Sequence, residues 1–91
     1  MPHDISSIDR DIEFMNNRSQ WTAMNGFVCP LRHVSKRDPE HPDLPHLGFL
    51  IAGHGFTVYI GIMYQIGHAD RLPTEEYASA NEVGDAGWRV D

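Results

Sequence analysis

The chain has 91 residues and a mass of 10.3 kDa, which is enough for one domain and excludes a multidomain enzyme. Hydrophobic residues make up 41% and charged residues 22%, as in a soluble globular protein rather than a disordered tail. Thirteen acidic against seven basic residues give a net charge of −6. This balance excludes a protein that holds nucleic acid through its phosphates, because that affinity comes from Lys and Arg. We expect residues 1–91 to form a single domain.

The N-terminal residues carry neither the basic region nor the apolar core of a secretory signal. Cys29 is the only cysteine, which excludes an internal disulfide and a multi-cysteine zinc site. Residues 47–66 contain no charged side chain and are long enough for a membrane-spanning helix. Their dense glycines and β-branched residues favour a β-hairpin instead. Together these features predict a cytoplasmic protein.

The first predicted element is an amphipathic helix, because Ile5, Ile8, Ile12 and Met15 recur at helical spacing. Phe14 points almost opposite this stripe. Either the helix is covered on two sides, which we favour, or Phe14 belongs to a contact surface.

Asn25-Gly26 then lies between two strand-like runs, residues 20–24 and 27–34. It is a strong signal for a hairpin turn, because both residues tolerate the positive φ of a type I′ turn. Pro30 cannot donate to a strand ladder, so the second run should have an open edge or a bulge there. In the following loop, Pro39, Pro42 and Pro45 recur every third residue, as along one side of a polyproline II helix. We interpret this loop as a stiff connector; a docking motif is the alternative.

A second hairpin is predicted from residues 47–52 and 56–65, with a turn at residues 53–55. Pro73 opens a predicted short helix that ends at Gly84, and residues 87–90 could form a last edge strand. The predicted fold class is therefore α+β: a four- or five-stranded antiparallel sheet of two β-hairpins, packed by an N-terminal and a short C-terminal helix.

Residues that could carry chemistry do not form a recognisable site. The six histidines show no helical i,i+4 pair, and no zinc, phosphate-binding or nucleophile motif occurs. Cys29 and His33 would share one face of a strand, but about 13 Å apart. We therefore predict no catalytic residue, no metal site, no cofactor and no enzymatic activity.

The net charge is concentrated in the two predicted helical ends, while residues 19–69 are neutral overall. Two helices on the same sheet face would bring their carboxylates to one outer surface, able to compete for a basic groove. The alternative is that these acids form ordinary solvated helix faces. Trp21 and Trp88 are candidate anchors, although in so thin a core we favour packing roles for both. Trp88, between Gly87 and Arg89, is the one expected to be more exposed, and it is therefore kept among the contact residues. The predicted partner-binding residues are Asp9, Asp11, Glu13, Glu75, Glu76, Glu82, Asp85 and Trp88.

In size, acidity and lack of a catalytic motif, the chain is similar to small phage-encoded inhibitors, including anti-CRISPR proteins. That similarity implies a non-enzymatic protein that blocks a larger partner with a basic surface, such as nucleic-acid machinery, without contacting nucleic acid or membrane directly. The alternative function is a small histidine-rich metal- or ligand-binding domain, or an enzyme acting as a homo-oligomer. A structural homodimer, formed by pairing of an edge strand, is a third hypothesis.

Overall fold

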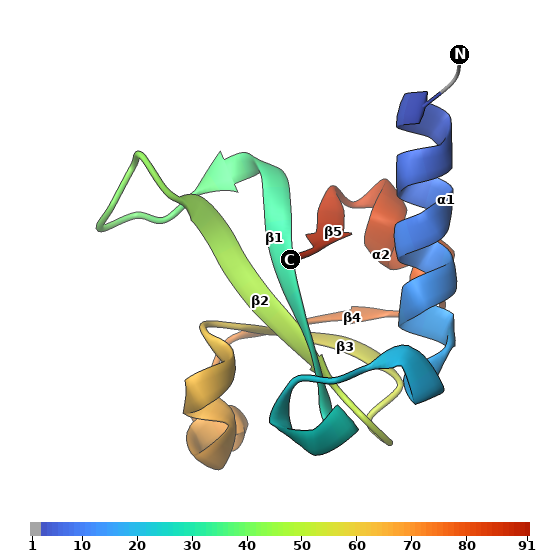
Figure 1. The fold of residues 1–91 in the computed structure, drawn as a ribbon. Helices are drawn as coiled ribbons and strands as arrows, with labels where there is room; N and C mark the ends of the chain where they lie inside the picture. The colour runs from blue at the N-terminus through green and yellow to red at the C-terminus, as the bar shows by residue number, and fades with distance from the viewer. Residues whose placement is uncertain (1–2) are drawn as a thin grey trace.

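The computed structural model in Figure 1 describes the backbone of residues 3–91 and the side chains of residues 8–91. Five strands form one antiparallel sheet in the order β4-β3-β2-β1-β5. They span Val28–Arg37 (β1), Pro45–Ile51 (β2), Phe56–Ile60 (β3), Thr74–Tyr77 (β4) and Trp88–Val90 (β5). The predicted α+β class is confirmed, and so is the last edge strand.

Two α-helices lie side by side at one end of the sheet, α1 (His3–Asn16) and α2 (Ala80–Asp85) (Figure 1). The core fills the space between these helices and one face of the sheet. It joins Met15 of α1 and Val83 of α2 to buried residues of the strands: Cys29, Leu31, Leu50, Val58 and Trp88. No helix of the described residues is both long and apolar enough to cross a membrane.

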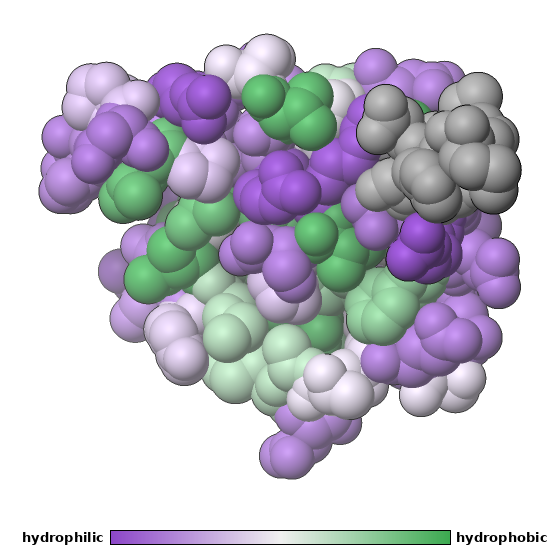
Figure 2. Space-filling view, turned by 45° about the horizontal axis from the view of Figure 1, so that its top comes forward, coloured by the Kyte–Doolittle hydropathy of each residue, from purple (hydrophilic) through white to green (hydrophobic). Residues whose placement is uncertain are grey.

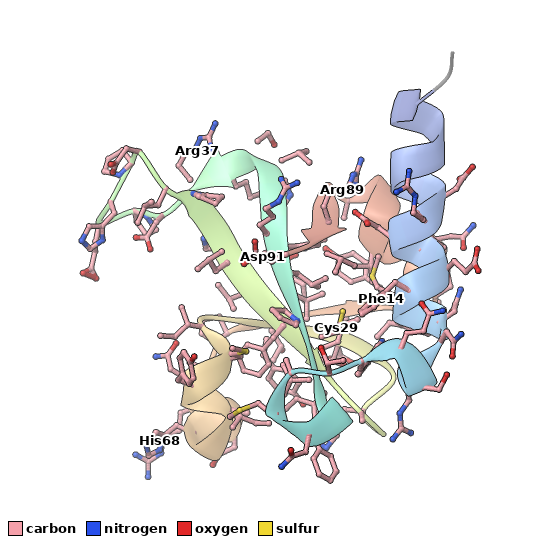
Figure 3. The ribbon with its side chains drawn as sticks, in the orientation of Figure 1. Phe14, Cys29, Arg37, His68, Arg89 and Asp91 are labelled. Atoms are coloured by element: carbon pink, nitrogen blue, oxygen red, sulfur yellow. The ribbon has the colours of Figure 1, made fainter. Side chains whose placement is uncertain are left out.

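The predicted stripe of α1 packs as expected where its side chains are described. Met15 is fully buried, Ile12 packs on the core, and Ile5 lies outside the described side chains. Phe14 is half-buried against the same core, between α1 and the sheet (Figure 3), which agrees with a helix covered on two sides. The backbone carbonyl of Phe14 also accepts the indole N–H of Trp21 at 2.8 Å.

The first predicted hairpin is largely wrong. Residues 18–20 form a short 3₁₀ helix, η1 (Arg18–Gln20), and only one bridge, Ala23 to Val28, joins the two segments. Asn25 and Gly26 do have positive φ angles, of 59° and 87°, but within a second 3₁₀ turn, η2 (Met24–Gly26). The dipeptide does form a turn, but 3₁₀ turns occupy both ends of the segment predicted as the preceding strand, and only Ala23 bridges to Val28.

β1 is longer than expected and is paired on both sides, with β2 and β5, so Pro30 is not on an open edge. Its carbonyl accepts the N–H of Asp91 at 2.9 Å. In an antiparallel ladder the missing N–H of Pro30 points to the same side, where β5 ends, so no inner hydrogen bond is lost.

The β1–β2 connection is not a polyproline II segment. Its backbone forms successive turns, with the N–H of His41 donating to Asp38 and the N–H of Leu44 donating to His41. The Asp38 carboxylate also accepts from the N–H of Glu40 at 2.8 Å. A polyproline II helix has no internal hydrogen bonds, so the three prolines do not share one side of such a helix.

β2 and β3 form the predicted second hairpin, with its turn at residues 53–55. However, β3 ends at Ile60 rather than at residue 65. A run of 3₁₀ turns, η3 (Met63–Arg71), follows it, after the N–H of Gly61 has bonded the carbonyl of Leu47. The prediction of a long strand was wrong because sequence periodicity did not show where the ladder partner ends.

The predicted helix from residue 73 was also wrong in its first half. Residues Thr74–Tyr77 form β4, paired with β3, and α2 begins only at Ala80. Ser79 caps α2 by accepting the N–H of Glu82 at 3.2 Å. Gly84 is not the C-cap: it is buried inside α2, and Gly87 has the positive φ, 105°, that follows the helix.

The sheet curls over the indole ring of Trp88. A flat sheet would place β5 about 19 Å from β4, four strand spacings away. Yet the indole N–H of Trp88 donates to the carboxylate of Glu75 on β4 at 3.1 Å. The ring crosses Gly48 on the central strand, where an added Cβ would lie 3.2 Å from indole Cη2 and 2.8 Å from Val58 Cγ1. A glycine is therefore required at that crossing.

Candidate partner-binding surfaces

Trp88 is a core residue and not an exposed anchor. Its exposed fraction is 0%, which contradicts the expectation that it lies partly in solvent. β5 pairs it with His33 on β1 and turns its side chain toward the helices. The His33 ring meets the indole edge-on at 5.0 Å between centroids, and the His46 ring lies at 5.9 Å. Its proximity to the chain end did not indicate exposure, because the short β5 strand places it over the centre of the sheet.

Glu75 is tied into the same cluster. Its Oε1 accepts from the hydroxyl of Tyr77 at 2.6 Å as well as from Trp88, and Lys36 Nζ lies 3.8 Å from Oε2. Burial raises the pKa of this carboxyl, but the two hydrogen bonds and the Lys36 charge outweigh burial and hold it below its usual value. Burial, followed by the bond to Glu75 and its charge, raises the pKa of Tyr77. Glu75 is therefore a structural carboxylate.

His33 is buried and uses both ring nitrogens. Its Nε2–H donates to the carbonyl of Ala86 at 2.8 Å, just after α2. Its Nδ1 accepts the backbone N–H groups of Lys36 at 3.0 Å and Ser35 at 3.2 Å. These contacts require the neutral ring, protonated on Nε2. His33 and Trp88 use all their ring N atoms within the fold, and Glu75 accepts two hydrogen bonds through Oε1, so these three residues stabilise the packing of the sheet against α2.

The predicted acidic residues fall into three places. Asp11 and Glu75 bond within the fold, Asp11 by accepting the N–H of Val90 at 3.3 Å. Glu76 is exposed on β4, on the opposite sheet face from Glu75. The remaining four are exposed on the two helices: Asp9, Glu13, Glu82 and Asp85. The structure thus does not bring the whole predicted set together.

The two helices that carry these four acids are in contact. Ile12 of α1 packs on Gly84 of α2, where an added Cβ would lie 3.2 Å from its side chain. Glu82 has a second task, because its carboxylate accepts the N–H of Ala78 at 3.0 Å and closes the first turn of α2. Asp9, Glu13 and Asp85 are exposed carboxylates with no hydrogen bond or ion pair to another described residue. We name these three residues and Glu82, the exposed acids of the two packed helices, the acidic helix surface.

Cysteine and histidine do not form a reactive pair. Cys29 is buried between α1 and the sheet (Figure 3), and burial, with the charge of Asp11, raises the pKa of its thiol to about 12. His54 bonds the Tyr59 hydroxyl, and His68 projects from η3, far from the helices (Figure 3). Among residues 8–91, no three His, Cys, Asp or Glu side chains gather as ligands for a metal ion.

A hollow of about 390 Å³ opens on the sheet face away from the helices. Its walls are mainly apolar, and Tyr64 and Ile62 beside it are 74% and 47% exposed. The lining includes Pro30, Leu47, Ile62, Met63, Tyr64 and Asp91. Sequence reasoning missed this hollow because it placed Ile62 to Tyr64 in a continuing strand, whereas η3 folds them over the sheet. Figure 2 likewise shows exposed hydrophobic residues between hydrophilic ones across the face it presents.

Comparison with known proteins identifies no relative: no family model, curated protein or solved structure matches the chain.

Proposed function

We propose that this protein is a non-enzymatic binding protein that docks on a basic surface of a larger protein and blocks it. The observation that carries the proposal is the acidic helix surface: Asp9 and Glu13 of α1 and Glu82 and Asp85 of α2 are exposed on two packed helices. The cluster around Trp88, by contrast, is fully used by the fold. Partners that normally hold phosphate groups, such as nucleic-acid machinery, have the complementary charge.

Electrostatic complementarity of this kind acts mainly on the association rate. Opposite charge on the two surfaces steers encounter and can raise the on-rate at least tenfold, an effect that salt screens. The exposed aliphatic and aromatic residues near the hollow would contribute apolar contact only if the partner reaches that face. We therefore expect association that weakens steeply with salt and that nucleic acid antagonises.

A matched pair of charge variants tests the proposal. The test variant carries Asp9→Lys, Glu13→Lys and Asp85→Lys, which leaves the capping residue Glu82 in place. The control carries Glu40→Lys, Asp43→Lys and Asp70→Lys, three exposed acids that lie outside both helices. Both variants have the same formal net charge, so a difference between them reports the position of the charges and not their number.

The assay is retention of proteins from the source cells on immobilised wild type and on each variant. We expect one stoichiometric protein that binds wild type and the control, is lost from the test variant, and is released by added salt or by duplex nucleic acid. Equal retention by the test variant would exclude the acidic helix surface as the interface. Retention that nucleic acid does not affect would exclude a phosphate-binding site as the blocked surface.

A further inference from the structure

The two edges of the sheet differ in whether other elements cover their outward backbone groups. At β5 the outward N–H of Val90 donates to the Asp11 carboxylate at 3.3 Å, so α1 covers that edge. The guanidinium of Arg89 also folds over this end, donating to the carbonyls of Gly84 and Trp88 at 2.8 Å. An added strand could not pair with β5 without displacing α1.

The outer edge of β4 is open. The N–H of Ile60 donates to the carbonyl of Pro73 at 2.8 Å, which fixes the alternation of the β3–β4 ladder. Backbone groups of Glu75 and Tyr77 therefore face β3, and those of Thr74 and Glu76 face outward. Thr74 and Glu76 are exposed, and within the described residues their outward N–H and C=O groups have no hydrogen-bond partner. This edge can accept a strand.

A second copy of this chain is not expected to pair with the outer edge of β4. The antiparallel register that bonds Thr74 to Glu76 of another copy places Glu75 opposite Glu75. The next register places Glu76 opposite Glu76. Like charges directly opposite each other destabilise a strand pair, and a charged edge is a common protection against self-pairing. The side chain of Glu76 makes no hydrogen bond or ion pair with another described residue, so a cation opposite it would be favourable.

We propose that the outer edge of β4 is a docking site for an extended segment of a partner protein that carries Lys or Arg opposite Glu76. The segment adds a sixth strand by bonding the backbone of Thr74 and Glu76, and the cation pairs with the Glu76 carboxylate. The proposal rests on the proposed function only for the sign of the partner's charge. The backbone contacts are independent of the acidic helix surface.

The probe is a capped peptide of alternating lysine and threonine, titrated into ¹⁵N-labelled protein. In one comparison peptide each lysine is replaced by glutamate. In the other, each lysine carries a backbone N-methyl group, because the lysine N–H groups are the ones that would bond Thr74 and Glu76. We expect saturable shifts of the Thr74 and Glu76 amide signals with a Kd of about 1 mM, as befits a few hydrogen bonds. The glutamate peptide and the N-methylated peptide should bind at least tenfold more weakly.

Two protein variants separate the backbone contribution from the charge. Thr74→Pro removes an outward N–H, which an edge strand tolerates, and should weaken the lysine peptide about fivefold. Glu76→Gln keeps the backbone and should abolish the preference for the lysine over the glutamate peptide. The control is Asp43→Asn, which removes the same charge from an exposed acid of the β1–β2 connection, outside both proposed surfaces, and should bind the lysine peptide like wild type. If the NMR spectrum of the Thr74→Pro variant is not native-like, the Glu76→Gln variant alone tests the proposal.

Three results would contradict docking at β4. The absence of shifts at saturating peptide, equal binding of the N-methylated peptide, or shifts confined to α1 and α2 would each overturn docking at β4. Failure here, with loss of the cellular partner from the helix variant, would leave the proposed function standing. Peptide binding at β4, with unchanged partner retention by the helix variant, would instead remove the acidic helix surface.

Discussion

Replacing Trp88 by phenylalanine tests whether its indole holds the two outer strands of the sheet together. The substitution keeps an aromatic ring over Gly48 but removes the N–H that donates to Glu75 at 3.1 Å. Tyr77 would still donate to the same carboxylate oxygen. The change is therefore confined to one hydrogen bond and to part of the ring that fills the core.

The expected loss of stability follows from these two contacts. A hydrogen bond to a charged acceptor contributes about 1.5–3 kcal/mol, and the smaller ring leaves a gap at a fully buried site that costs about 1 kcal/mol more. The sum, about 3 kcal/mol, is a large part of the 5–15 kcal/mol typical of a domain. It corresponds to a fall in Tm of about 10–25 °C.

Urea unfolding followed by circular dichroism measures this loss. The double-mutant cycle with Glu75→Gln isolates the pair, because glutamine keeps an accepting oxygen but loses the charge. We expect a coupling free energy of about 1–2 kcal/mol and an unchanged m value. A Trp88→Phe variant within about 0.5 kcal/mol of wild type, or a coupling near zero, would refute the argument that this bond holds β4 and β5 together.

Residues of the same core should also respond to pH, to alkylation and to substitution. The pKa of Glu75 is lower in the folded than in the unfolded chain, so the stability it contributes is present at neutral pH and is lost as pH falls through the folded pKa. The Glu75→Gln variant should therefore lose less stability than wild type on acid titration. Parallel stability curves for the two proteins would contradict this. The Cys29 thiol, with a pKa raised to about 12, should resist iodoacetamide at pH 8 and react on unfolding, so rapid alkylation of native protein would show that it is accessible. Stabilisation from that thiol is present below its unfolded value of 9.0 and declines as pH rises toward 12. Gly48→Ala should lower the free energy of unfolding by about 1–3 kcal/mol, because its Cβ would meet Val58 and the Trp88 ring. In the control, Gly53→Ala, the Cβ would meet no atom within 4 Å, so any loss of stability should come from its positive φ alone. A Gly48→Ala protein as stable as wild type in thermal unfolding would show that Trp88 does not pack tightly on Gly48.

The sequence predicted those parts of the fold that depend on local patterns. The helical spacing of Ile8, Ile12 and Met15 predicted α1, and the turn glycines around His54 predicted the β2–β3 hairpin. The positive φ angles of Asn25 and Gly26 were predicted for the same reason. A side chain's spacing and a residue's allowed φ are properties of the chain itself, so they can be recognised without knowing its neighbours.

The candidate site was predicted as a list of seven acids and Trp88, and Trp88 proved to be buried. The concentration of charge at the two ends is a property of composition, and Asp9, Glu13, Glu82 and Asp85 are exposed on helices as expected. Their neighbours Asp11 and Glu75 are not available, because Val90 and Trp88 donate to them from strands distant in sequence. An isolated glycine inside a strand, Gly48, was the one signal that a large side chain would cross there.

By itself, the sequence determined the size, the net charge of −6, the α+β class and the turns at Asn25-Gly26 and at residues 53–55. Tertiary structure decided which carboxylates are free, that Trp88 is buried, that Thr74–Tyr77 is a strand, and that one sheet edge is covered while the other is open. The physical reason is that strand pairing and burial depend on partners far along the chain. A run such as Thr-Glu-Glu-Tyr can start a helix or form an edge strand, and the backbone groups of β3 decide between them.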